Sequence, residues 1–266
     1  MITEPLLTDV AQAIEAYAPP RLQESYDNTG WQVLCDPAGR CSGIVSCVDP
    51  TPAVVAEAVA KGCNLIVSHH PLMFHGQKSF TGSTLVQRTV MDAMRAGVSV
   101  YSCHTAIDSA PGGISAEMAT MLGLTGVSVL SPAAADPAAG LGAAGTLPAP
   151  LTPGELAEKV KGTFGVPVAR CSRPAPGLEI SRVALCGGSG AEFIPTAIAA
   201  GAQAYITSDV KHHDFVDFGP DIFIIDIPHW SAEACARTLF ARIVSSSFPA
   251  LPVIAAEADR CPVIHL

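Results

Sequence analysis

Histidines occur in pairs, or together with a carboxylate, at three places in the chain, and each place follows a short apolar run. The three groups are His69 and His70 after NLIVS, His104 and Asp108 in HTAID, and His229 and Glu233 in HWSAE. A donor set of imidazoles and carboxylates suits borderline divalent ions such as Zn, Mn, Fe, Co or Ni. We therefore expect the protein to hold a pair of divalent metal ions, with these expected ligands: His69, His70, Asp108, His229 and Glu233.

The spacing within each group indicates how the ligands would be shared. Adjacent side chains that leave a strand point in opposing directions, so His69 and His70 are expected to serve ions on either side. His229 and Glu233 are four residues apart at the entry of a predicted helix and so share one of its faces. Glu233 has two carboxylate oxygens and could bridge two ions.

Each group has a plainer interpretation when it is considered alone. The His69–His70 pair could be a loop pair without a role, and Asp108 could cap the turn before APGG. Glu233 could stabilise a helix N-terminus electrostatically. The combination favours the metal site, because six of the eight histidines fall in four polar groups at predicted strand ends.

The fourth polar group is TSDVKHHD (207–214), in which Asp209, Lys211 and His213 could bind a substrate phosphate or act as acid or base. A surface turn explains it equally well. GGSG (187–190) could cradle an anion, but a tight structural turn is the better default. Asp27 and Asn28, in SYDNTGW (25–31), could reach a site or form a turn.

Alternating strand and helix patterns must position these groups. Apolar periodicity and capping residues predict helices at 5–18, 51–62, 83–97, 152–164, 191–201 and 231–247. Short apolar runs predict strands at 43–49, 64–70, 98–105, 180–190, 202–210, 221–228 and 252–257. The pattern indicates an α/β protein whose polar groups gather at the C-terminal ends of parallel strands.

The two halves repeat one plan, so we expect two similar α/β lobes with mixed sheets flanked by helices and the metal site between them. The first lobe would span 1–130 and the second 151–266, with the C-terminal strand returning to the first lobe. Residues 131–150 are rich in Pro, Ala and Gly and almost uncharged, which predicts a linker or loose loop.

Composition narrows the possible functions. The formal net charge is -9, which disfavours nucleic-acid binding. The nine cysteines are scattered without a CxxC pair, which favours buried thiols in a reducing compartment. The N-terminus lacks the positive start of a signal peptide, and no apolar run is long enough for a membrane helix. We expect a cytoplasmic protein without a membrane partner.

The chain resembles the Nif-three-like dinuclear-metal family, whose members are often labelled GTP cyclohydrolase 1 type 2 homologues. The resemblance spans nearly the whole chain and is carried by these segments: SYDNTGWQV, the HHP loop, HTAID with PGG, CGGSG, ITSDVKHHD and HWSAE. It implies two metal ions, with Glu233 between them and His104 as a ligand or support. It also implies a homo-oligomer, a toroidal hexamer, in the compact form without a mid-chain domain. The chain departs from the family pattern at Ser208, where glycine is common, at His212, and at Ile227 and Pro228.

A dinuclear site of this kind predicts a metal-dependent hydrolase acting on a nucleotide or another small phosphorylated or cyclic substrate. GTP cyclohydrolase chemistry is one version, and His104 or His213 is the candidate proton shuttle. The alternative is a non-catalytic metal-binding or scaffold protein that acts through partners. An open coordination position would favour the enzyme, and ligand-saturated ions would favour the scaffold.

Overall fold

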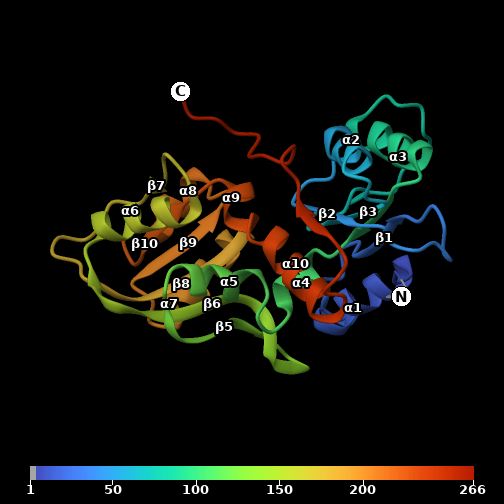
Figure 1. The fold of residues 1–266 in the computed structure, drawn as a ribbon. Coiled ribbons are helices and arrows are strands. Elements are labelled where there is room, and N and C mark those ends of the chain that lie inside the picture. Colours follow the sequence, from blue (N-terminus) through green and yellow to red (C-terminus); the bar gives the residue numbers. More distant parts are fainter. Residues whose placement is uncertain (1–3) are drawn as a thin grey trace. The chain divides into compact units, whose positions relative to one another are not determined.

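The computed structural model describes residues 4–266 and contains two mixed sheets flanked by helices, as the sequence predicted (Figure 1). The chain divides into two compact units. Unit 1 comprises residues up to Ile107 together with Ala236–Arg260, and unit 2 comprises Asp108–Cys235 together with Cys261–Leu266. In the described part of the chain, no helix has both the length and the apolar character needed to cross a bilayer.

Unit 1 is built on a five-stranded sheet in the order β1-β4-β3-β2-β11. β2, β3, β4 and β11 run parallel, and β1 pairs antiparallel with β4. The strands are β1 (Gly30–Val33), β2 (Ile44–Cys47), β3 (Leu65–Ser68), β4 (Ser99–Ser102) and β11 (Val253–Ala255). The helices are α1 (Leu7–Tyr17), η1 (Pro20–Leu22), α2 (Pro52–Ala60), α3 (Leu85–Ala96), most of α4 (Thr105–Ser109) and α10 (Ala236–Ser247).

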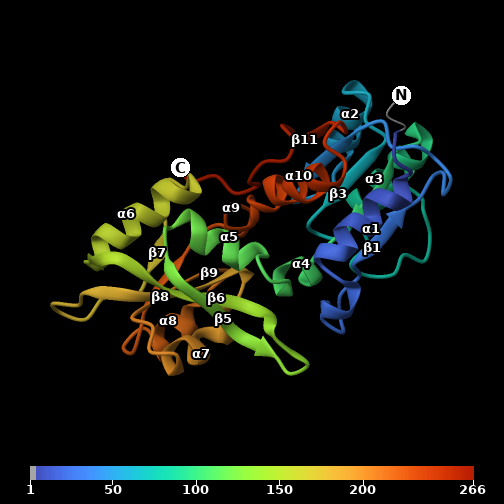
Figure 2. The ribbon, with the colours of Figure 1, turned by 60° about the horizontal axis from the view of Figure 1, so that its bottom comes forward.

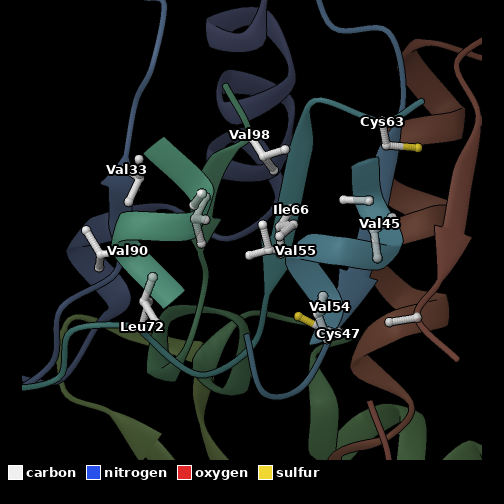
Figure 3. Close-up of a cluster of buried hydrophobic side chains, with 14 residues drawn as sticks. Val33, Val45, Cys47, Val54, Val55, Cys63, Ile66, Leu72, Val90 and Val98 are labelled. Carbon is white, nitrogen blue, oxygen red and sulfur yellow. The ribbon is translucent and has the colours of Figure 1, made fainter. Parts of the chain in front are cut away.

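The core of unit 1 follows from strand alternation. Val45, Ile66 and Val100 point to the face covered by α2 and α3, where they pack with Val54 and Val90 (Figure 3). Ser46 points to the opposite face, where its hydroxyl donates to the carbonyl of Arg237 in α10. The sheet is therefore covered on both faces, and its polar positions are left at the strand ends.

The helix boundaries follow the predicted capping signals. Thr51 accepts a hydrogen bond from the Val54 amide, and Pro52 occupies the first turn of α2. Thr84 caps α3 in the same way, and Gly97 ends α3 with a φ of 68°. The β2-α2-β3 and β3-α3-β4 units that result bring the ends of three parallel strands to one edge of the sheet.

Unit 2 is built on a six-stranded sheet in the order β5-β6-β8-β9-β10-β7. Its strands are β5 (Thr125–Ala133), β6 (Asp136–Leu151), β7 (Arg170–Cys171), β8 (Ile180–Ser189), β9 (Ala204–Ser208) and β10 (Phe223–Asp226). Its helices are α5 (Ile114–Met121), α6 (Pro153–Phe164), η2 (Ala191–Phe193), α7 (Ile194–Ala199), α8 (His212–Phe218) and α9 (His229–Glu233). β8, β9 and β10 run parallel, and α5 and α6 lie on the face opposite to α7 and α8 (Figure 2).

Two features of this organisation differ from the expected domains 1–130, 131–150 and 151–266. Residues 131–150 are not a linker but lie almost entirely in the antiparallel strands β5 and β6. The boundary between the units falls at Ile107 rather than near residue 130, and α10 belongs to unit 1 because it packs on α1 and β2. The late strand β11 does return to the first sheet, where it pairs with β2.

Candidate metal centre

Three candidate site histidines of unit 1, His69, His70 and His104, lie where the parallel strands end. β3 is completely buried, and its backbone pairing with the neighbouring strand extends past Ser68. The amide of His69 donates to the carbonyl of Cys47, and the amide of His70 donates to that of Val48. His104 follows β4, the other neighbour of β3. The C-terminal edge of the sheet thus gathers all three imidazoles, as expected for a parallel sheet.

The three imidazole rings form one cluster. The ring centroids are 5.1 Å apart for His69 and His70, 5.2 Å for His69 and His104, and 5.4 Å for His70 and His104. One nitrogen from each ring lies within 4.8 Å of the others, the spacing of ligands around an ion. His69 and His70 lie at a bend that follows β3, and the expectation that they serve ions on either side stays a prediction.

Each of the three clustered histidines, His69, His70 and His104, is held through its Nδ1 atom. His70 Nδ1 lies 2.8 Å from Asp49 Oδ1, and His104 Nδ1 lies 2.8 Å from Asp27 Oδ1. His69 Nδ1 lies 3.3 Å from the carbonyl oxygen of Cys103. An Nδ1–H that donates to an oxygen places the lone pair of the neutral ring on Nε2, which is the arrangement found around protein-bound metals.

Asp27 ties the SYDNTGW segment to the cluster. One carboxylate oxygen contacts His104, and the other accepts hydrogen bonds from the amide and hydroxyl of Thr105. Burial raises the pKa of the Asp27 carboxyl, but the hydrogen bonds from His104 and Thr105 outweigh burial and hold the pKa well below its usual range. Asp27 is therefore a carboxylate at neutral pH and fixes the orientation of the His104 ring.

His229, the candidate ligand histidine of unit 2, lies on α9, which packs on β8 and β9. His229 Nε2 is 3.0 Å from Glu233 Oε2, so the i, i+4 spacing does bring the two side chains together. His229 Nδ1 is 2.6 Å from Asp209 Oδ2, which repeats the arrangement seen in unit 1. Asp209 has a φ of 58°, an uncommon conformation for a residue other than glycine and one that clusters at functional sites.

Gly188 makes room for the Glu233 carboxylate. A Cβ atom at this position would lie 3.2 Å from His229 Nε2 and only 2.2 Å from Glu233 Oε1. The Gly188 backbone has a φ of 66°, and its carbonyl accepts a hydrogen bond from the Thr207 hydroxyl. The C-terminal end of β8 is thus a cradle that accommodates the Glu233 carboxylate.

Asp108 lies on α4, the short helix that follows β4 and carries the chain from His104 into unit 2. Within unit 2, the charges of Asp108 and Glu233 both raise the pKa of the Cys186 thiol. Burial is the main cause that raises the pKa of this thiol to about 12, and the charges of the two carboxylates add to it. Asp108 and Glu233 therefore lie in one electrostatic neighbourhood, in which a cation would offset their repulsion.

Two cavities in unit 2 open beside the expected ligands. One of about 380 Å³ is lined by Asp108, by the PGG turn and by the β5–β6 hairpin. Another of about 230 Å³ is lined by His229, Asp209 and Arg170, together with residues of the C-terminal segment. Both have the size of a small-molecule site.

The comparisons with known proteins agree with this geometry. The family described as Duf34/NIF3 (NGG1p interacting factor 3) matches residues 5–262. The chain belongs to the Duf34/NIF3 family. A relative in Lactococcus lactis, named GTP cyclohydrolase 1 type 2 homolog, is 34% identical over 90% of this chain and 91% of its own. A relative of the same name in a Nostoc species is 35% identical over 87% of this chain and 89% of its own.

Solved structures with low sequence identity share the fold. A hypothetical protein of Staphylococcus aureus has a TM-score of 0.91 at 24% identity, covering 99% of this chain and 100% of its own. A Bacillus cereus protein described as related to NIF3 has a TM-score of 0.91 at 20% identity, with the same coverage. The arrangement of two mixed sheets flanked by helices is therefore the fold of this family.

The structure groups some of the predicted site residues and leaves others apart. Within unit 1 it clusters His69 and His70 with His104, and within unit 2 it pairs His229 with Glu233. His213, the other candidate proton shuttle, is exposed on α8, where its ring contacts that of His212 at a centroid distance of 5.4 Å. Its catalytic role stays a prediction.

Sequence reasoning did not identify the residues that hold the histidines. The sequence assigns no role to Asp49, it suggests substrate binding or acid–base catalysis for Asp209, and for Asp27 it leaves open a site or a turn. Each lies 20 or more positions from its histidine. The signal that could have found them is the position of each aspartate at the end of a predicted strand or in a polar turn.

Ser208 is a buried hydroxyl at the end of β9, at the position where the resemblance leads one to expect glycine. Its side chain is fully buried, and its Oγ has no hydrogen-bond partner among residues 4–266. Strand alternation places Ser208 on the same face as Ile206, opposite to Tyr205, which packs against α7. An unpartnered buried hydroxyl costs free energy that a methyl group does not.

We therefore expect Ser208→Ala to raise the free energy of unfolding by about 1 kcal/mol, measured by urea denaturation. The matched control is Ser172→Ala in the same unit. The Ser172 hydroxyl accepts a hydrogen bond from the Ile224 amide at 2.9 Å, so its removal should lower the free energy of unfolding. If both variants lose stability equally, the Ser208 hydroxyl has a partner and the assignment is wrong.

Proposed function

We propose that the protein binds two divalent metal ions through His69, His70, Asp108, His229 and Glu233 and uses them for hydrolysis. The substrate would be a nucleotide or another small phosphorylated or cyclic compound. One observation carries the proposal. Each of the four histidines His69, His70, His104 and His229 has its Nδ1 held by a carboxylate or carbonyl oxygen.

The donor set fits divalent ions in kind as well as in position. Three imidazoles offer ligand atoms within 4.8 Å of one another, which is a spacing that suits a bound ion. The carboxylates supply negative charge that neutral imidazoles lack. Asp49, Asp27 and Asp209 act as outer partners, which orient the rings and increase the basicity of Nε2.

When bound, two divalent ions would supply the positive charge that activates water and neutralises an anionic substrate. The protein itself would contribute a base. The Asp27 carboxylate holds His104 Nδ1 at 2.8 Å, so the ring presents Nε2 to accept a proton, and Asp27 stabilises the imidazolium that forms. The net charge of -9 also supports a role for bound cations, because an acidic chain would otherwise repel phosphate.

The names of the relatives suggest which substrate to test first. Those in Lactococcus lactis and Nostoc are named as homologues of GTP cyclohydrolase 1 type 2. Opening of the guanine ring of GTP is a hydrolytic reaction and is therefore one version of the proposal. The fold alone does not select it, because one fold supports many reactions.

The test is turnover of GTP and of a panel of nucleotides and phosphoesters by metal-loaded protein, beside the variants His104→Ala and His213→Ala. We expect turnover to fall by 10²–10⁴-fold in the variant that removes the proton shuttle and to persist in the other. Absence of turnover with every compound, in protein that holds two ions, would contradict the hydrolase. It would leave the metal-binding scaffold that acts through partners.

A further inference from the structure

Two aromatic side chains remain exposed beside the histidine cluster of unit 1. Tyr26 is 61% exposed and Phe74 is 41% exposed. Aromatic rings contribute a large apolar area and are normally buried. Two exposed rings beside a candidate site therefore indicate a surface that a bound ligand would cover. The question is which kind of ligand these rings would suit.

The rings adjoin the cluster in space. The centroid of Phe74 lies 6.4 Å from that of Tyr26 and 6.1 Å from that of His104. Phe74 also meets the ring of His75, with centroids 5.1 Å apart and planes 74° apart. Phe74 is therefore the common neighbour of one candidate site histidine and two exposed rings.

Backbone and side-chain hydrogen bonds fix these rings relative to the cluster. Asn28 Nδ2 donates to the carbonyl of Met73 at 2.7 Å, and the Met73 amide donates to Gln32 Oε1 at 3.0 Å. Gln32 Nε2 in turn donates to the Asn28 carbonyl at 2.8 Å. Phe74 directly follows Met73, so the loop that carries Phe74 is anchored through both backbone polar groups of Met73.

Tyr26 is anchored from the other direction. It directly precedes Asp27, whose carboxylate contacts His104 and Thr105. Tyr26 is thus the neighbour of Asp27, and Phe74 is the neighbour of Met73. The hydrogen bonds of Asp27 and Met73 hold the SYDNTGW segment beside the histidine cluster. Such preorganisation lowers the entropy lost when a ligand binds.

We propose that Tyr26 and Phe74 form an aromatic shelf beside the histidine cluster, on which Phe74 stacks the planar heterocycle of the substrate, of purine type, and Tyr26, tilted by 54° to Phe74, borders it. The inference rests on the proposed function and adds a subsite to it. Stacking needs only a planar π-face, and a ring stacked on Phe74 would lie about 3.5 Å from it. The ring centroid of His104 is 6.1 Å from that of Phe74, so the stacked ring would lie within reach of the cluster. The shelf residues Tyr26 and Phe74 carry no formal charge, so the shelf would select for the ring rather than for phosphate.

The experiment is calorimetric titration of metal-loaded protein with guanosine and adenosine, which carry the ring without phosphate, and with ribose 5-phosphate, which lacks the ring. We expect the nucleosides to bind and Phe74→Leu to weaken their binding by roughly five- to a hundredfold. Leucine keeps the apolar bulk and removes the π-face. The matched control is Phe80→Leu, because Phe80 is a phenylalanine of the same unit with a similar exposure of 47%.

The outcomes separate the shelf from the proposed function. Nucleoside binding that depends on Phe74, without turnover of any compound, supports the shelf and overturns the hydrolase. Turnover with an unchanged KM in Phe74→Leu overturns the shelf and leaves the hydrolase. Equal binding by Phe74→Leu and Phe80→Leu, or no nucleoside binding by the wild type, also overturns the shelf. Should Phe74→Leu fail to fold, Tyr26→Leu tests the same surface.

Discussion

A Glu233→Gln variant is expected to fold normally and to lose bound metal. Glu233 is 3% exposed, and its Oε2 lies 3.0 Å from His229 Nε2. Glutamine keeps the size of the side chain but removes its negative charge and one of its two oxygen donors. Loss of an outer partner lowers metal affinity by about 10–100-fold, so loss of a ligand should cost at least that much. The measurement is elemental analysis of desalted protein after loading with Zn or Mn.

Two control variants make this result specific. Glu192→Gln makes the same chemical change at an exposed position of unit 2 and should leave the metal content intact. His75→Ala removes an imidazole that lies beside Phe74, and it should also leave the metal content intact. If Glu233→Gln binds as much metal as these controls, Glu233 is not a ligand and the bridging role is wrong. A circular dichroism spectrum confirms that each variant is folded.

The elements of the α/β alternation could be predicted because local signals specify them. α2, for example, has a threonine cap, a first-turn proline and a run of small apolar residues, and the structure places it within two residues of the predicted range. The His69–His70 bend could not be predicted, because strand periodicity describes residues inside a strand and not those that leave it. The oligomer and the cellular compartment stay predictions, since a single chain displays neither.

The strands at 125–151 were missed for a physical reason. Their sequence is rich in alanine, glycine and proline, which lack strand propensity, and it does not alternate between apolar and polar residues. The glycines are there for close backbone approach. A Cβ at Gly140 would lie 2.2 Å from the Ser131 carbonyl oxygen, and one at Gly142 would lie 3.0 Å from that of Leu185. Composition that resembles a linker thus serves a tightly packed hairpin.

The histidines of the candidate site could be predicted, and their supports could not. A histidine at a strand end is visible in the sequence, whereas the pairing of His104 with Asp27 depends on how β1 docks antiparallel against β4. The SYDNTGW segment was interpreted as a turn, but its Gly30 and Trp31 begin β1 and set that register. The hydrogen-bond partners of the site histidines are brought together only by the tertiary structure, so local sequence patterns do not predict them.

Gly188 offers a second large effect, at a position without a donor side chain. A methyl group added there would lie 2.2 Å from Glu233 Oε1, so Gly188→Ala must displace the Glu233 carboxylate or move the backbone at the end of β8. The variant also forces alanine to a φ of 66°, which costs about 1–2 kcal/mol by itself. We expect Gly188→Ala to lose metal as Glu233→Gln does, although every proposed ligand is still present.

Gly201→Ala separates the two causes. Gly201 lies in the same unit with a φ of 72°, and a Cβ there would meet no atom within 4 Å. Both alanine variants should therefore lose similar stability in urea denaturation, by about 1–2 kcal/mol, while only Gly188→Ala loses metal in elemental analysis. Full metal content in both variants would mean that the Glu233 carboxylate does not need the space beside Gly188 to bind metal. Loss of metal in both would mean that backbone strain in unit 2, rather than the cradle, controls the site.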